Sequence, residues 1–194
     1  MKNIHLLVAL TLGCVACSSE SKEVKTEQAP ADTMAPVVAT PVSAIDEKNG
    51  FRSHHFGDDF ATFPGLLPVV SYGPADIKQY RLPKENLQVG DVKLSTITYS
   101  FYKGRFYSVL VHANKRDNAA FDKLTAAATS LYGKGKEFSS GNGTGWYGEK
   151  VSGSVSIEDS SGYRVPQLHL TSKVVEKQIE ADKLSVGKKA ASDL

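Results

Sequence analysis

The sequence predicts a mixed α+β domain in which an antiparallel sheet with a central β-hairpin carries two helices on one face. Two observations support this fold class. Apolar and polar residues alternate along 92–112 and again in three short segments after residue 144, as in half-buried strands. Apolar residues recur at helical spacing once between these groups of strands and once after them. The order strands, helix, strands, helix is typical of α+β domains.

Length, composition and charge limit the protein to one domain with appendages. The chain has 194 residues, of which 41% are hydrophobic and 23% are charged. Its 23 basic side chains are nearly balanced by 21 acidic ones, which leaves a formal charge of +2. This balance excludes a general nucleic-acid binder, since such proteins carry an obvious basic excess. No apolar run after residue 17 approaches the roughly 20 residues of a membrane-spanning helix.

Residues 1–16 are typical of a secretory signal peptide. Lys2 supplies a positive start, 4–12 is almost continuously apolar, and small residues follow up to Cys17. The apolar stretch is too short for a stable transmembrane anchor, so we expect cleavage. Cys14 and Cys17 are the only cysteines of the chain, and the mature domain therefore contains no disulfide.

Residues 12–19, Leu-Gly-Cys-Val-Ala-Cys-Ser-Ser, resemble the lipobox of bacterial lipoproteins. The resemblance implies that a cysteine is diacylated and becomes the first residue of the mature chain. We assign this lipidation to Cys17, because cleavage before Cys14 would leave an unusually short signal; Cys14 is the alternative. The serine that follows Cys17 implies, by the same resemblance, sorting to the periplasmic face of the outer membrane. An ordinary cleaved signal that leaves a free thiol is the other interpretation.

A change in composition divides the mature chain. Residues 17–49 contain prolines and no aromatic residue, so we expect a lipidated N-terminus followed by a disordered tether. Aromatic residues begin at Phe51, which predicts a folded domain over 51–183. We expect 184–194 to be a flexible tail.

The clearest element is a β-hairpin within 92–112, whose strands are separated by Lys103 and Gly104. A two-residue turn places Phe101 opposite Phe106. It also places Ile97 opposite Leu110, so the core face carries Ile97, Tyr99, Phe101, Phe106 and Leu110. The opposite face is too apolar for a surface in water, because it carries Tyr102, Tyr107, Val109 and Val111. Either another part of the chain covers this face or it binds a partner.

Two helices and three further strands complete the predicted domain. A helix of about four turns, capped by Asp117 or Asn118, is predicted to end before Gly133. Strands are predicted at 145–148, 152–158 and 167–170, and a last helix runs to about Lys183. The run from Phe51 to Lys134 resembles small uncharacterised bacterial envelope proteins, and this resemblance implies no activity.

Catalytic and metal-binding motifs are missing from the sequence. The mature domain has no cysteine nucleophile, and no Gly-x-Ser-x-Gly motif occurs. His54, His55, Asp58 and Asp59 have metal-ligand side chains, but adjacent histidines of a strand point to opposite faces and cannot hold one ion together. We therefore predict that the protein is not an enzyme and uses no metal or other cofactor.

The remaining function is noncatalytic binding or envelope assembly, with the membrane contacted through the lipid and an envelope protein as partner. Trp146 and Tyr147 follow a glycine-rich loop, and Tyr107 lies on the second face of the hairpin. Aromatic side chains supply large contact areas with few torsions to immobilise, so these three residues are the predicted contacts. A core position for Trp146 is the alternative.

Two other functions stay open. One is a periplasmic hydrolase with an unidentified site. The other is an enzyme inhibitor, because Ser160-Ser161-Gly162-Tyr163 is similar to the Ser-Gly-x-x-Tyr loop of lipoproteins that inhibit lysozyme. A pocket that gathers acids and histidines would favour the enzyme, whereas an exposed apolar feature would favour binding.

Overall fold

The computed structural model describes residues 42–70, 74, 76–114, 119–160 and 162–192. The predicted signal peptide, Cys17 and most of the predicted tether lie outside these residues. Asp117 and Asn118, the predicted helix caps, also lie outside them.

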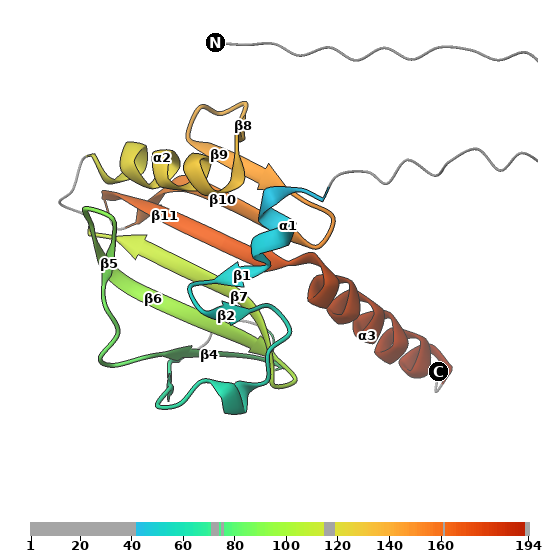
Figure 1. The fold of residues 1–194 in the computed structure, drawn as a ribbon. Helices are drawn as coiled ribbons and strands as arrows, with labels where there is room; N and C mark the ends of the chain where they lie inside the picture. The colour runs from blue at the N-terminus through green and yellow to red at the C-terminus, as the bar shows by residue number, and fades with distance from the viewer. Residues whose placement is uncertain (1–41, 71–73, 75, 115–118, 161, 193–194) are drawn as a thin grey trace, which may run out of the picture. The chain divides into compact units, whose positions relative to one another are not determined.

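A nine-stranded sheet forms the body of the domain (Figure 1). Its strands follow the order β3 (Leu67–Pro68), β4 (Ile77–Arg81), β6 (Val92–Tyr102), β7 (Arg105–Ala113), β11 (Tyr163–Ser172), β10 (Val151–Ser160), β9 (Gly143–Tyr147) and β8 (Lys136–Glu137). The short β5 (Gln88–Val89) pairs with β6 beside this path, and every pairing is antiparallel. β1 (Gly50–Phe51) and β2 (His54–His55) form a separate two-stranded ribbon. The mixed α+β class predicted from the sequence is confirmed.

β6 and β7 are joined by the two-residue turn Lys103–Gly104, whose φ angles are 49° and 78°. Positive φ at both positions is the geometry of the turn that matches strand twist, and glycine adopts it without strain. Phe101 lies opposite Phe106 across the turn, and both rings are buried.

The register changes beyond Phe106, because Tyr107 is an extra residue without a partner on β6. Such a bulge reverses which residues face the core. Ile97 therefore pairs with Val111, and the expected pairing with Leu110 was wrong. Val109 and Val111, expected on the opposite face, are fully buried in the core.

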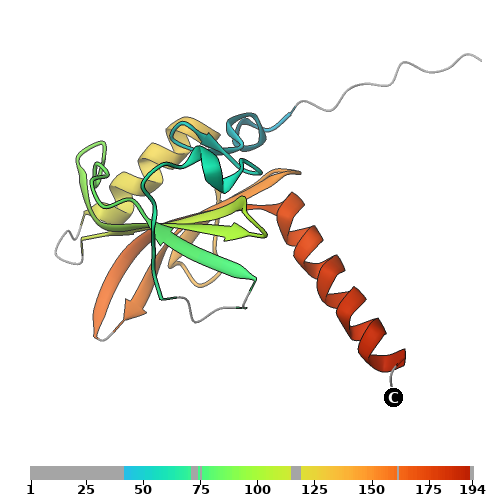
Figure 2. The ribbon, with the colours of Figure 1, turned by 90° about the horizontal axis from the view of Figure 1, so that it is seen from below.

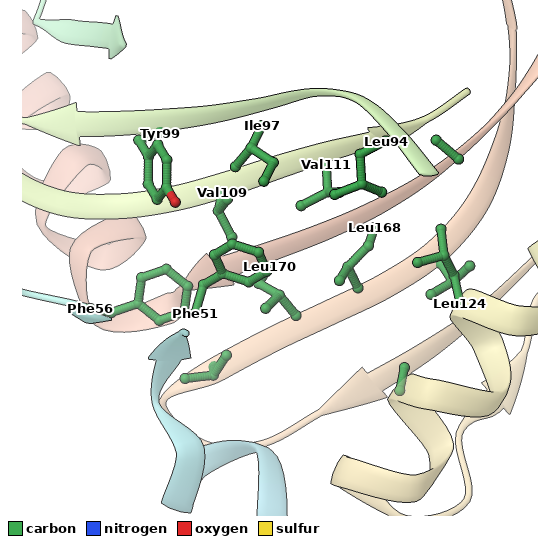
Figure 3. Packing of buried hydrophobic residues seen from close by; sticks show 14 of the residues in the cluster. Phe51, Phe56, Leu94, Ile97, Tyr99, Val109, Val111, Leu124, Leu168 and Leu170 are labelled. Atoms are coloured by element: carbon green, nitrogen blue, oxygen red, sulfur yellow. The ribbon is translucent and has the colours of Figure 1, made fainter. Parts of the chain in front are cut away.

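Helices α1 (Ala44–Lys48) and α2 (Ala120–Tyr132) pack on what we call the core face of the sheet (Figures 1 and 2). Figure 3 shows buried side chains of β6, β7 and β11 spread along this face, from Tyr99 near Phe56 at one end to Leu168 near Leu124 of α2 at the other. α2 contributes Ala120, Leu124 and Ala128 to this core, at the spacing of one helix face. A 3-10 turn, η1 (Phe60–Thr62), closes the aromatic end of the core, where Phe60 and Phe63 lie with ring centroids 5.2 and 4.9 Å from that of Phe101.

Helix α3 (Lys173–Ser192) packs against the other side of the sheet, which we call the second face. Val175 and Ile179, one turn apart, cover Tyr102 and contact Tyr107. In Figure 2, α2 lies above the sheet, whereas α3 runs down and away from it. The expectation that both predicted helices lie on one face was therefore wrong, because α3 packs on the apolar patch that Tyr102 and Tyr107 form on the second face. The helix also extends into the predicted flexible tail.

The folded part begins earlier than Phe51, because α1 lies within the predicted tether. Ile45 is buried in the core. The carboxylate of Asp46 accepts the backbone N–H groups of Glu149, Lys150 and Val151 at 2.7, 2.8 and 2.9 Å. Burial acts to raise the pKa of Asp46, but these three donors outweigh it and hold the pKa below its usual value.

Candidate functional site

A cavity of about 290 Å³ lies between the α1–β1 segment and α2, and we call it the α1–α2 cavity. Its size is at the lower end of the range for small-molecule sites, about 300–1,000 Å³. The residues that line it are mostly apolar: Lys48, Gly50, Phe51, Arg52, Val89, Leu124, Ala127, Ala128, Leu131, Tyr132 and Leu168. None of these described lining residues is acidic or a histidine, so the cavity resembles a site for an apolar ligand more than an active site.

The sequence of α2 explains why this space stays open. Ala127 and Ala128 face the α1–β1 segment with side chains of a single carbon, too short to fill the gap. Leu131 follows one turn later and is 52% exposed, an unusual position for leucine. The cavity therefore opens toward solvent beside an apolar side chain.

Two cations belong to this cavity, and they differ in their partners. Arg52 contacts the Glu85 carboxylate and donates to the carbonyl oxygen of Asn86 at 2.6 Å. Glu85 also accepts from the hydroxyl of Tyr99, and burial together with this carboxylate raises the pKa of Tyr99 well above its usual range. Lys48 is exposed and forms no ion pair with any residue that the structure describes. One cation is therefore free to meet an anionic group.

The three predicted contact residues do not form one site. Trp146 is 4% exposed, and its Nε1 donates to the carbonyl oxygen of Gly133 at 2.8 Å, so it occupies the alternative core position. Tyr147 points to the second face and is 62% exposed. Tyr107 is half-buried beside α3. Tyr147 alone remains an open contact residue.

The second face brings together two histidines that the sequence separates. The hydroxyls of Ser108 and Thr171 lie 3.3 and 3.1 Å from Nε2 of His169. Thr96 Oγ1 lies 3.2 Å from Nδ1 of His112, and Nε2 of that ring lies 3.4 Å from the Glu158 carboxylate. Only strand pairing reveals these contacts, since no local motif marks them.

A hydroxyl beside an imidazole is the first requirement of a serine hydrolase, but acyl transfer also needs N–H donors for the oxyanion. β7 and β11, which carry Ser108 and His169, are each paired with a strand on both sides. The backbone N–H groups beside these residues are therefore used within the sheet. Their arrangement suits hydrogen bonding to a ligand better than covalent catalysis.

The four residues considered as metal ligands have structural partners. Asp58 accepts the backbone N–H of His55 at 2.8 Å, and Asp59 caps η1 by accepting the N–H of Ala61 at 3.0 Å. The His54 ring stacks on Phe63 with centroids 3.8 Å apart. Among the residues that the structure describes, no group of three or more histidine, cysteine or acidic side chains could hold a metal ion.

The inhibitor-like loop falls partly outside the described residues, since Ser161 is not among them, and Tyr163 is 52% exposed. No helix in the described part of the chain is long and apolar enough to cross a membrane. Comparisons of the chain with family models, curated proteins and solved structures give no match. The chemistry of the cavity and of the second face must therefore carry the functional assignment.

Proposed function

We propose that this protein is a noncatalytic binding lipoprotein, held at the periplasmic face of the outer membrane by lipid on Cys17. Its domain binds a small anionic amphiphile in the α1–α2 cavity. In this proposal the hairpin of β6 and β7 is the central scaffold, and α2 forms one wall of the site. An envelope protein that delivers or accepts the ligand would be the partner.

A single observation carries the proposal: a mostly apolar cavity is lined in part by Lys48, an exposed cation that forms no ion pair with the residues that the structure describes. An acyl chain that enters the cavity gains about 0.8 kcal/mol for each buried methylene. An exposed ion pair between Lys48 and a carboxylate or phosphate adds only up to about 1 kcal/mol. The acyl chain of the ligand therefore supplies most of the affinity, and Lys48 supplies orientation and a preference for anions.

Displacement of a fluorescent fatty acid from the chain bearing Cys17→Ser tests this function. Ala127→Phe places a ring in the cavity, and we expect it to weaken binding at least tenfold. Ala126→Phe is the matched control, because its neighbouring position on α2 is exposed and does not line the cavity. Lys48→Met should weaken binding of a fatty acid only a few-fold and leave binding of the matching alcohol unchanged. Equal binding by the two phenylalanine variants would disprove the site.

Lipidation has a separate test. We expect Cys17→Ser to release the protein from membranes, because two or more acyl chains are needed for stable anchoring. Mass spectrometry of the mature N-terminus should show an acylated Cys17. An unmodified terminus, or acylation of Cys14, would contradict the assignment while leaving the cavity proposal intact.

A further inference from the structure

The open part of the second face is a regular array of side chains, and seven of its eight members are polar. Thr98, Leu110, His169 and Ser154 are directly paired neighbours across β6, β7, β11 and β10. Thr96, His112, Gln167 and Ser156 form the next row on the same strands. His169 is exposed and the other seven are half-buried. We call these eight residues the polar grid.

Two aromatic rings extend the rows of the polar grid over β9. Gly145 pairs with Ser154, and Gly143 pairs with Ser156. A Cβ added at Gly145 would come within 2.5 Å of Tyr147 Oη, and one at Gly143 would come within 2.5 Å of the Phe138 ring. The two glycines therefore leave room for rings to lie against the sheet. Since Tyr147 is 62% exposed, much of its ring remains open to a ligand.

The polar grid carries no unpaired charge. His112 faces Glu158, and Nε2 of His169 lies beside the hydroxyls of Ser108 and Thr171. Partial burial against the sheet lowers the pKa of His169 and so disfavours its charged form, although part of the residue stays exposed. Hydroxyl, amide and imidazole groups both donate and accept hydrogen bonds. None of the eight grid residues is a lysine or arginine, although Lys136 pairs with Gly145 at the end of one row, so the grid itself complements a neutral polar ligand better than a polyanion.

We infer that the polar grid binds a neutral glycan strand, with Tyr147 stacked on a sugar ring. A sugar presents a face of C–H groups that packs on an aromatic ring, and its hydroxyls lie at the edge, where grid side chains can bond them. Strands lie about 4.8 Å apart, so β9, which carries Tyr147, is about 10 Å from β11, which carries His169 and Gln167. A short oligosaccharide spans this interval. The inference is independent of the α1–α2 cavity, which lies against the core face.

Titration with N-acetylglucosamine oligomers, followed by calorimetry, tests the inference on the chain bearing Cys17→Ser. We expect saturable binding that Tyr147→Ala weakens at least tenfold and Tyr147→Phe largely preserves. Tyr163→Ala is the matched control, because Tyr163 is an exposed tyrosine at the tip of the β10–β11 hairpin, six residues along β11 from His169. Gly145→Ala should also weaken binding, since the new methyl group displaces the Tyr147 ring.

The outcomes separate this site from the amphiphile site. Ala127→Phe should leave oligosaccharide binding unchanged, and a fatty acid should not compete. The inference is overturned if neutral oligosaccharides do not bind, if Tyr147→Ala binds them normally, or if an anionic oligosaccharide or an acidic peptide binds this face more tightly. None of these results depends on whether the α1–α2 cavity is occupied.

Discussion

The two faces of the sheet are formed by the same strands but differ in their side chains, which are apolar and buried on one face and mostly polar on the other. On the core face, β6 and β7 contribute Ile97, Phe101, Phe106 and Val111, which are all buried. On the second face, the same strands contribute threonine, serine and histidine with Leu110 among them, and an apolar patch is formed around Tyr102 and Tyr107. α3 covers that patch and leaves the polar grid open. The comparison teaches that one face is buried and provides stability, whereas much of the other remains accessible to solvent.

The largest expected effect is on the core face. Phe101→Ala should destabilise the domain by about 3–5 kcal/mol, because the ring is 2% exposed and its removal leaves a cavity among aromatic rings. Thr98→Ala on the second face of the same strand removes a half-buried side chain and should cost less than about 1 kcal/mol. Urea denaturation measures both. Similar small changes would mean that the two faces do not differ as described.

Truncation of a side chain of α3, the helix that covers the apolar patch, should have a smaller effect on the stability of the domain. Ile179→Ala should cost about 2–3 kcal/mol, since Ile179 is 7% exposed but lies at the edge of the domain. Val174→Ala on the same helix is the control, because Val174 is 59% exposed and should change stability by less than about 0.5 kcal/mol. If the two variants denature alike, α3 does not pack on the second face.

A substitution at Asp46 tests how strongly the hydrogen bonds between α1 and the β9–β10 turn stabilise the domain. Asp46→Asn should cost about 2 kcal/mol near neutral pH, because the amide accepts fewer of the three N–H bonds and carries no charge. The folded pKa of Asp46 lies below the unfolded value, so its contribution is complete above about pH 4 and is lost as the pH falls through the folded pKa. Denaturation curves of the two proteins should converge in acid. A constant difference down to about pH 2 would argue against this role.

The smallest expected effect is that of Tyr147→Ala on the fluorescence of its neighbour Trp146, because the two side chains point to different faces. Trp146 is the only tryptophan, so its fluorescence reports on the core face alone. We expect blue-shifted, quencher-resistant emission that Tyr147→Ala leaves unchanged. Emission that becomes shielded only when an oligosaccharide is added would move Trp146 to the surface and contradict the structure.

Local patterns were sufficient for part of this fold. The turn Lys103–Gly104, the pairing of Phe101 with Phe106, and the helix that ends before Gly133 depend on residues close in the chain, so the sequence predicts them. The bulge at Tyr107 could not be predicted, because one extra residue changes the face of every residue beyond it without changing the local alternation. α1 was missed since a single turn without aromatic residues has no periodic signal; only its contacts with the β9–β10 turn reveal it.

The sequence by itself determined the fold class and the confinement of the cysteines to 14 and 17, since both follow from composition and local periodicity. The tertiary structure decided which face each aromatic residue occupies, where α3 packs, and how the two candidate sites form. The α1–α2 cavity combines residues from 48 to 168, and the polar grid joins the β6–β7 hairpin to β10 and β11, which follow α2, β8 and β9 in the chain. Such sites depend on contacts between distant segments, and these contacts exist only once the chain has folded.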